Sequence, residues 1–126
     1  MNLIDSSGWL EYFADGPNAA FFAAPIKKAS QLIVPSVCLY EVFKRIHHQR
    51  GEGAALQAVS IMHEGLIIEL DAELALLATK FSLELKLPMA DSIIYASGYA
   101  NNAVIWTQDA DFANLAGVKY IAKAQR

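Results

Sequence analysis

Short apolar runs alternate along this chain with longer segments of helical periodicity. The apolar runs predict strands at residues 2–4, 32–34, 66–70, 103–106 and 118–121. They are apolar throughout and do not alternate with polar positions, which is typical of parallel strands covered by helices on both faces. Strands separated by helices pair in parallel through right-handed crossovers. The pattern therefore predicts one α/β domain over residues 1–126, without an internal repeat or linker.

Capping residues and chain breakers mark the ends of the predicted helices. Ser6 and Ser7 are expected to cap the first helix, and Ser36 the long helix that ends at Gly51. Pro35 is expected to stop the second strand. The other helices are predicted from the Gly16-Pro17 break to about 29, then at 53–63, 71–86 and 88–102, with a short one at 109–115.

Composition narrows the class of protein. Hydrophobic residues make up 55% of the chain and charged residues 18%, and the mean hydropathy is +0.27. This excludes intrinsic disorder and predicts that some apolar surface of so small a domain meets another chain. The one cysteine, Cys38, excludes a disulfide framework and is expected in the core. The uncharged apolar run at 19–26 is too short to span a membrane, so we expect a cytoplasmic protein with no membrane association.

The charge balance limits how the chain could bind nucleic acid. Thirteen acidic residues against ten basic ones give a formal net charge of −3. This net negative charge argues against a protein that binds nucleic acid through overall positive charge. It leaves open a site in which acidic residues gather around metal ions.

Several carboxylates follow directly after predicted strands. Asp5 ends the first strand, and Asp109 and Asp111 come just after the fourth. Ligands of open parallel sheets bind at the carboxyl ends of strands, where the strand order reverses. An aspartate after a strand also commonly caps the next helix. Both interpretations stay open for each residue, because the sequence does not prove that the two strands are neighbours.

Glu41 lies on a predicted helix with two possible roles. It is turned about 200° from Leu39 of the buried stripe and lies in line with Lys44, Arg45 and His48. One interpretation is a solvated face with a Glu41–Arg45 pair, which helical geometry alone favours. The other is a carboxylate near the sheet edge, followed by a basic track.

Asp91 adds a fourth candidate position, in the first turn of the helix that Pro88 opens. An acid there is either a helix-dipole partner or part of a site. If the carboxylates converge, their mutual repulsion raises their pKa values unless a divalent cation lies among them. An all-oxygen ligand set favours Mg²⁺ or Mn²⁺, and no cysteine or histidine spacing suits zinc.

Four segments of the chain together resemble the PIN-domain nucleases. They are LIDSS at 3–7, VCLYEV at 37–42, LPMADSIIYA at 87–96 and WTQDADF at 106–112. Their order and separations are similar to those of the small single-domain VapC toxins of bacterial toxin–antitoxin pairs. Ser92 and Tyr95 depart from the family pattern, which usually has smaller residues there.

The resemblance implies a three-layer PIN-like domain whose five-stranded parallel sheet places the first and fourth strands side by side. It implies that the catalytic acids at one end of the sheet are Asp5, Glu41, Asp91 and Asp109. Of these, the implied metal ligands are Asp5, Asp91 and Asp109. The residues expected around them are Ser6, Thr107 and Asp111. The residues expected to bind RNA are Lys44, Arg45, His48 and Arg50.

The implied activity is Mg²⁺- or Mn²⁺-dependent hydrolysis of RNA phosphodiester bonds by activated water. The implied partners are a VapB-like antitoxin and a second copy of the chain, with DNA contacted only through the antitoxin. The alternative is a catalytically silent PIN-like binding module that acts in a DNA-bound repressor complex. A phosphoryl-accepting receiver-like domain is disfavoured, because Lys119 lies inside the fifth strand and not after a late strand.

Overall fold

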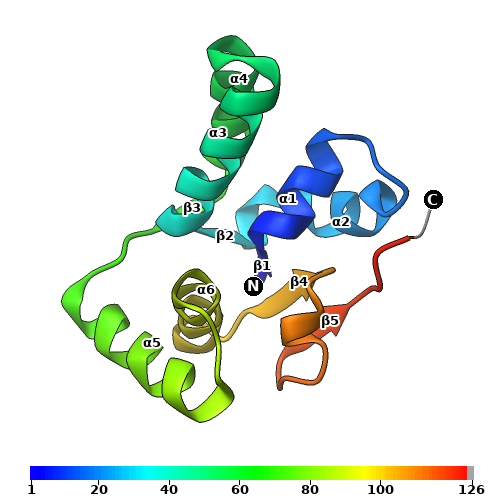
Figure 1. Ribbon diagram of the computed structural model, residues 1–126. Coiled ribbons are helices and arrows are strands. Elements are labelled where there is room, and N and C mark those ends of the chain that lie inside the picture. Colours follow the sequence, from blue (N-terminus) through cyan, green and yellow to red (C-terminus); the bar gives the residue numbers. More distant parts are fainter. Residues whose placement is uncertain (125–126) are drawn as a thin grey trace.

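The chain folds around a parallel sheet with the strand order β3-β2-β1-β4-β5 (Figure 1). The computed structural model describes residues 1–124, and within this part the sheet has five strands, all paired in parallel. They are β1 (Asn2–Ile4), β2 (Leu32–Pro35), β3 (Leu66–Ile68), β4 (Val104–Thr107) and β5 (Val118–Tyr120). The predicted fold class is confirmed.

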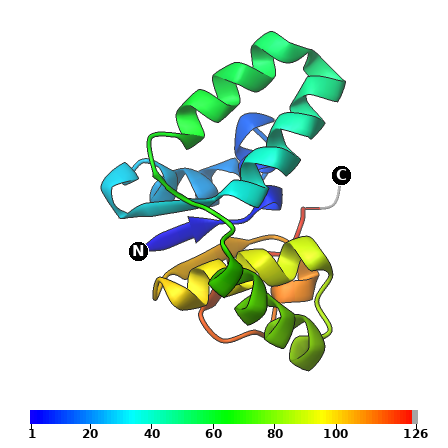
Figure 2. The ribbon, with the colours of Figure 1, turned by 90° about the vertical axis from the view of Figure 1, so that its left-hand side faces the viewer.

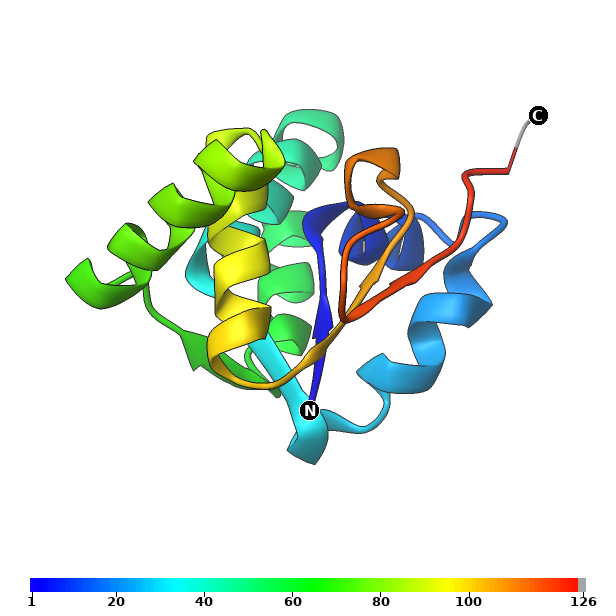
Figure 3. The same cartoon turned by 90° about the horizontal axis from the view of Figure 1, so that it is seen from below.

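Helices cover both faces of this sheet. They are α1 (Ser6–Phe13), α2 (Ala19–Ile26), α3 (Ser36–Arg50), α4 (Glu52–Met62), α5 (Ala72–Leu85) and α6 (Met89–Ala100). Figure 2 shows α5 and α6 on the opposite side of the sheet from the α3–α4 hairpin. Figure 3 shows β1 and β4 between α6 and α2. No helix in the described part of the chain is both long and apolar enough to cross a membrane.

The central strand β1 pairs with both β2 and β4. Leu3 aligns with Ile105 and Ile4 with Trp106, so the first and fourth strands are neighbours as the resemblance implied. The backbone N–H of Asp5 donates to the carbonyl of Trp106 at 3.2 Å. The strand order reverses beside β1, and a ligand crevice is therefore expected at the carboxyl ends of β1 and β4.

Apolar residues of the strands and of the first two helices are buried together in one core. Leu3, Ile33, Trp9 and Phe22 are fully buried, and Cys38 is buried in the same cluster as predicted. Gly8 lets α1 approach this core, because an added Cβ would lie 2.6 Å from Phe22 Cε1. The first turn of α1, and with it Asp5, is thereby fixed against the sheet.

Two predicted helix caps were wrong. The N-cap of α1 is Asp5, whose side chain accepts from Gly8 N, and neither Ser6 nor Ser7 has that position. The N-cap of α3 is Pro35, without a side-chain cap bond, and Ser36 is the first helical residue. The first difference follows from position, because Asp5 is the last extended residue before the helix, whereas Ser6 and Ser7 are already helical.

Several element ends also differ from the predictions. Pro35 does not stop β2 but is its last residue, in register with Ile68 of β3. Proline has no backbone N–H to donate to a neighbouring strand, and the end of a strand tolerates the loss of that hydrogen bond. The second helix ends at Ile26, just after Pro25, and a separate 3₁₀ turn, η1, spans Ala29–Gln31. The helix expected at 109–115 is shorter, a single 3₁₀ turn η2 at Ala110–Phe112.

Candidate metal centre

Asp5 is held at the end of β1 by donors on both carboxylate oxygens. Oδ1 accepts from Gly8 N at 2.9 Å and from Ser7 Oγ at 2.8 Å. Oδ2 accepts from Thr107 Oγ1 at 2.6 Å, and Ser7 Oγ also approaches it at 2.9 Å. Asp5 is only 2% exposed. Asp5 therefore caps α1, and its carboxylate also lies within electrostatic reach of Asp109.

A chain of hydrogen bonds connects Asp5 to the other strand-end acids. Thr107 Oγ1 donates to Asp5 and accepts from the backbone N–H of Asp109 at 2.8 Å. Asp109 Oδ1 in turn accepts from the N–H of Asp111 at 2.9 Å and caps η2. These bonds connect the turn after β4 to the end of β1. They give the carboxylates of Asp109 and Asp111 in this turn a defined position.

Asp91 approaches the same turn from α6. It lies in the first turn of that helix and is half-buried. One carboxylate oxygen each from Asp91, Asp109 and Asp111 can lie within 4.8 Å of one another. Carboxylate oxygens at such separations suit a hard divalent cation and give no reason to expect zinc. The residues therefore fit Mg²⁺ or Mn²⁺.

Glu41 faces the centre from α3. Its Oε1 accepts from Ser6 Oγ at 2.7 Å, across the contact between α1 and α3. The side chain is half-buried. It is therefore not part of a freely solvated helix face, which is the interpretation that helical geometry alone favoured. This hydrogen bond fixes the direction of the Glu41 carboxylate.

The electrostatics of the centre explain why a cation fits there. Burial raises the pKa of Asp5 to about 6, against the hydrogen bonds from Thr107, Gly8 and Ser7, which lower it. Burial raises the pKa of Asp91 to about 7, and the charges of Asp109, Asp111, Asp5 and Glu41 add to this rise. A divalent cation would relieve both the repulsion and the desolvation of these carboxylates.

The structure therefore brings the four predicted acids within electrostatic reach of one another. It gives Asp111 a more central place than the sequence suggested, since its oxygen joins those of Asp91 and Asp109. Ser7 was missed as a partner of Asp5. A serine two residues after a strand-end aspartate, at the start of a helix, was the available signal.

The predicted basic track is divided between two surfaces of α3. Arg45 and Arg50 line a cleft against α1. Lys44 and His48 line a different hollow, together with Tyr40. All four basic residues are exposed. Lys44 and His48 are four positions apart and share one face of α3, whereas Arg45 and Arg50 contribute to the cleft against α1.

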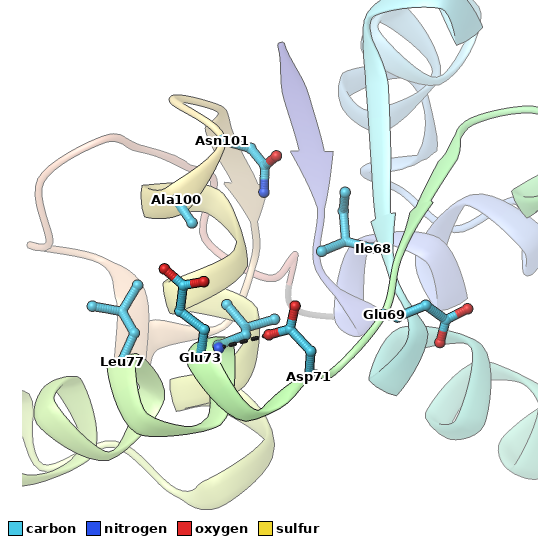
Figure 4. A pocket seen from close by; sticks show the side chains of 8 residues that line it. Ile68, Glu69, Asp71, Glu73, Leu77, Ala100 and Asn101 are labelled. Carbon is cyan, nitrogen blue, oxygen red and sulfur yellow. Dashed lines mark hydrogen bonds between the residues drawn. The ribbon is translucent and has the colours of Figure 1, made fainter.

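Another acidic hollow lies beside β3 and belongs to a different part of the molecule. A cavity of about 310 Å³ is lined by Glu69, Asp71 and Glu73, with Ala100 and Asn101 at the end of α6 (Figure 4). Asp71 Oδ1 accepts from Leu74 N at 2.8 Å and caps α5, at the start of the helix that the sequence predicted over 71–86. This carboxylate has a structural partner, and the metal centre shares none of these residues.

A comparison with protein families matches the PIN domain over residues 3–118. The chain belongs to the PIN domain family. No curated protein has a matching sequence. The match spans the strand-end acids of β1 and β4, so the candidate centre lies within the PIN domain itself.

Solved structures share the fold of this PIN domain at low sequence identity. A toxin–antitoxin complex from Klebsiella pneumoniae has a TM-score of 0.80 and 21% identity, over 94% of this chain and 96% of that one. VapC20 of Mycobacterium tuberculosis, a toxin that cleaves the sarcin–ricin loop, has a TM-score of 0.76 and 15% identity, over 92% and 95%. A DNA-bound VapBC complex from Salmonella typhimurium has a TM-score of 0.76 and 14% identity, over 97% and 98%.

Proposed function

We propose that this PIN domain is a divalent-metal-dependent endoribonuclease and the toxin of a toxin–antitoxin pair. The observation that carries the proposal is the approach of Asp91, Asp109 and Asp111 to within 4.8 Å, at the end of β1 and β4. The likeness of the whole fold to toxins of known structure supports the same function. The alternative of a silent binding module has no comparable support, because the sequence keeps all four acids that the activity requires, Asp5, Glu41, Asp91 and Asp109.

The proposed metal ligands are Asp91, Asp109 and Asp111, with the predicted ligand Asp5 beside them. Mg²⁺ or Mn²⁺, when bound, supplies Lewis acidity toward the phosphodiester and makes water a better nucleophile at neutral pH. Asp5 keeps its orientation through Ser7, Gly8 and Thr107, so its charge stays fixed at the centre. Glu41 is held by Ser6 on the α3 side. Its carboxylate adds a further acceptor for water or RNA hydroxyls.

The proposed partners are an antitoxin similar to VapB and a second copy of the chain, with DNA reached through the antitoxin. Large apolar side chains exposed around α5 support association: Leu76 is 74% exposed, Leu83 77% and Met89 77%. Because the proposed substrate is RNA, we place the protein in the cytoplasm. Light scattering on the purified chain, alone and with its antitoxin, measures both associations.

The decisive experiment is cleavage of a mixed single-stranded RNA pool by the purified chain in Mg²⁺, in Mn²⁺ and in EDTA. We expect cleavage with either metal and none in EDTA. Asp91→Asn and Asp109→Asn are expected to lose about 100-fold or more of this activity. Glu64→Gln, an exposed acid after α4, is the matched control and should cleave as the wild type does. Equal cleavage by all variants would identify a contaminating nuclease and contradict the proposal.

A further inference from the structure

A basic cleft lies between α1 and α3, on the side of the molecule that carries the metal centre. Its volume is about 570 Å³. Arg45 and Arg50 of α3 line it, and so does Lys123 from the segment after β5. The acidic residue in the described lining is Glu11, whose Oε2 accepts from Asn18 N at 2.8 Å. The cleft therefore has an excess of positive charge in a chain whose net charge is −3.

Two residues join this cleft to the metal centre. Ser7 lines the cleft, and its Oγ also donates to Asp5 at 2.8 Å. Gln108 lines the cleft and directly follows Thr107, and its backbone N–H approaches Ser7 Oγ at 3.4 Å. The basic cleft thus begins where the acidic centre ends. A polyanion that reaches the centre would continue naturally into the cleft.

The position of Lys123 is set by buried hydrogen bonds and not by sequence proximity. Asn18 Nδ2 donates to the carbonyl of Ala122 at 3.0 Å and to Gln108 Oε1 at 3.0 Å. Asn18 and Gln108 are only 8% and 7% exposed. The N–H of Ile121 also donates to the carbonyl of Thr107. These bonds fix the backbone beside Lys123 against the end of β4.

We propose that this cleft binds backbone phosphates of single-stranded RNA next to the phosphate at the metal centre, with Lys123 as a phosphate-binding residue beside Arg45 and Arg50. The inference rests on the proposed function, since it takes RNA as the substrate. Acidic residues at the centre repel a phosphodiester, and adjacent cations offset that repulsion. The planar guanidinium groups of the two arginines can each donate a pair of hydrogen bonds to phosphate oxygens. Contacts with backbone phosphates do not depend on the base sequence.

The size of the cleft suits a flexible single strand. Its volume of about 570 Å³ is that of a small-molecule pocket and has room for one or two nucleotides. The division of the basic residues of α3 agrees with this assignment. Lys44 and His48 lie on the other hollow, away from the residues that connect the cleft to Asp5.

The test is the binding of a fluorescent single-stranded RNA to the full chain in EDTA, measured by anisotropy at several salt concentrations. Lys123→Gln and Arg50→Gln are both changes at exposed positions. Each is expected to weaken binding roughly two- to tenfold and to reduce the slope of log K against log salt by about 0.7. Lys80→Gln removes an exposed lysine of α5, on the other side of the sheet, and should leave affinity and slope unchanged.

Cleavage measurements give a second readout. Because the cleft holds flanking phosphates equally in the ground and transition states, Lys123→Gln should raise KM by the factor lost in binding and leave kcat unchanged. Wild-type affinity and slope in both variants would overturn the proposal. The same result is expected if Arg50 and Lys123 bind a protein partner and not RNA. Failure of the proposed function looks different: the chain would cut no RNA, yet Lys123→Gln would still weaken RNA binding.

Discussion

Thr107 Oγ1 donates a 2.6 Å hydrogen bond to Asp5 Oδ2, although the two residues are 102 positions apart in the chain. Thr107 is fully buried, and the same hydroxyl accepts from the N–H of Asp109. One side chain thus orients the carboxylate that follows β1 and the turn that carries Asp109 and Asp111 after β4. The pairing of β1 with β4 makes this contact possible.

Replacing Thr107 tests this link. Thr107→Val should leave an acceptor on Asp5 and the N–H of Asp109 without their partner, and it should lower the free energy of unfolding by about 1–3 kcal/mol. Removing this bond also raises the pKa of Asp5 further, since the bond lowers it. Denaturant unfolding measures the loss. Thr79→Val, at an exposed position of α5, is the control, and an equal effect of the two changes would contradict the prediction.

The raised pKa values of Asp5 and Asp91 predict how stability depends on pH without metal. The folded protein keeps these protons up to about pH 6 and 7, whereas the ordinary value for aspartate is 3.8. Between these limits the folded state binds more protons than the unfolded state. The contribution of the two groups to the free energy of unfolding therefore falls as the pH rises from about 4 to 7.

Asp91→Asn should remove part of this dependence. Asp91 is half-buried, so solvent screening reduces the effect to about 1 kcal/mol at pH 7, or roughly 3–5 °C in Tm. The variant is thus expected to be more stable than the wild type at pH 7 in EDTA and nearly equal at pH 4. Melting curves across this range measure it, with Glu64→Gln as the control. A constant difference at every pH would contradict the assignment.

Metal affinity tests the place of Asp111 in the centre. Asp111→Asn should weaken Mn²⁺ binding about tenfold or more, because its oxygen lies with those of Asp91 and Asp109. Asp71→Asn changes a carboxylate of the separate acidic hollow and should leave the affinity unchanged. Calorimetric titration measures both. Wild-type affinity in Asp111→Asn would return this residue to the outer role that the sequence suggested.

A double-mutant cycle tests how Lys123 is positioned. Asn18→Ala removes the bond to the carbonyl of Ala122 and should weaken RNA binding by about the factor that Lys123→Gln does, roughly two- to tenfold. The double variant should bind no more weakly than either single one, because both changes remove the same phosphate contact. Additive losses would show that Asn18 does not act through Lys123. Unfolding curves confirm that each variant is folded.

The sequence by itself determined the fold class and most of the acidic positions. The apolar runs predicted every strand. Burial by helices on both faces explains this for the central strands β1 and β2, whereas the edge strands β3 and β5 are partly exposed. The helix predicted over 71–86 is α5, with Asp71 as its N-cap. Asp5, Asp91 and Asp109 stand where strand ends and a helix start put them, since these positions follow from local signals.

Only the tertiary structure decided which of these residues meet. Local signals could not separate a solvated Glu41 from one bonded to Ser6, because that bond depends on how α1 packs against α3. The division of the basic residues on α3 depends on which helix or segment covers each face. Lys123 joins Arg45 and Arg50 through the buried bonds of Asn18 and Gln108. Such contacts join residues far apart in the chain, and no local periodicity encodes them.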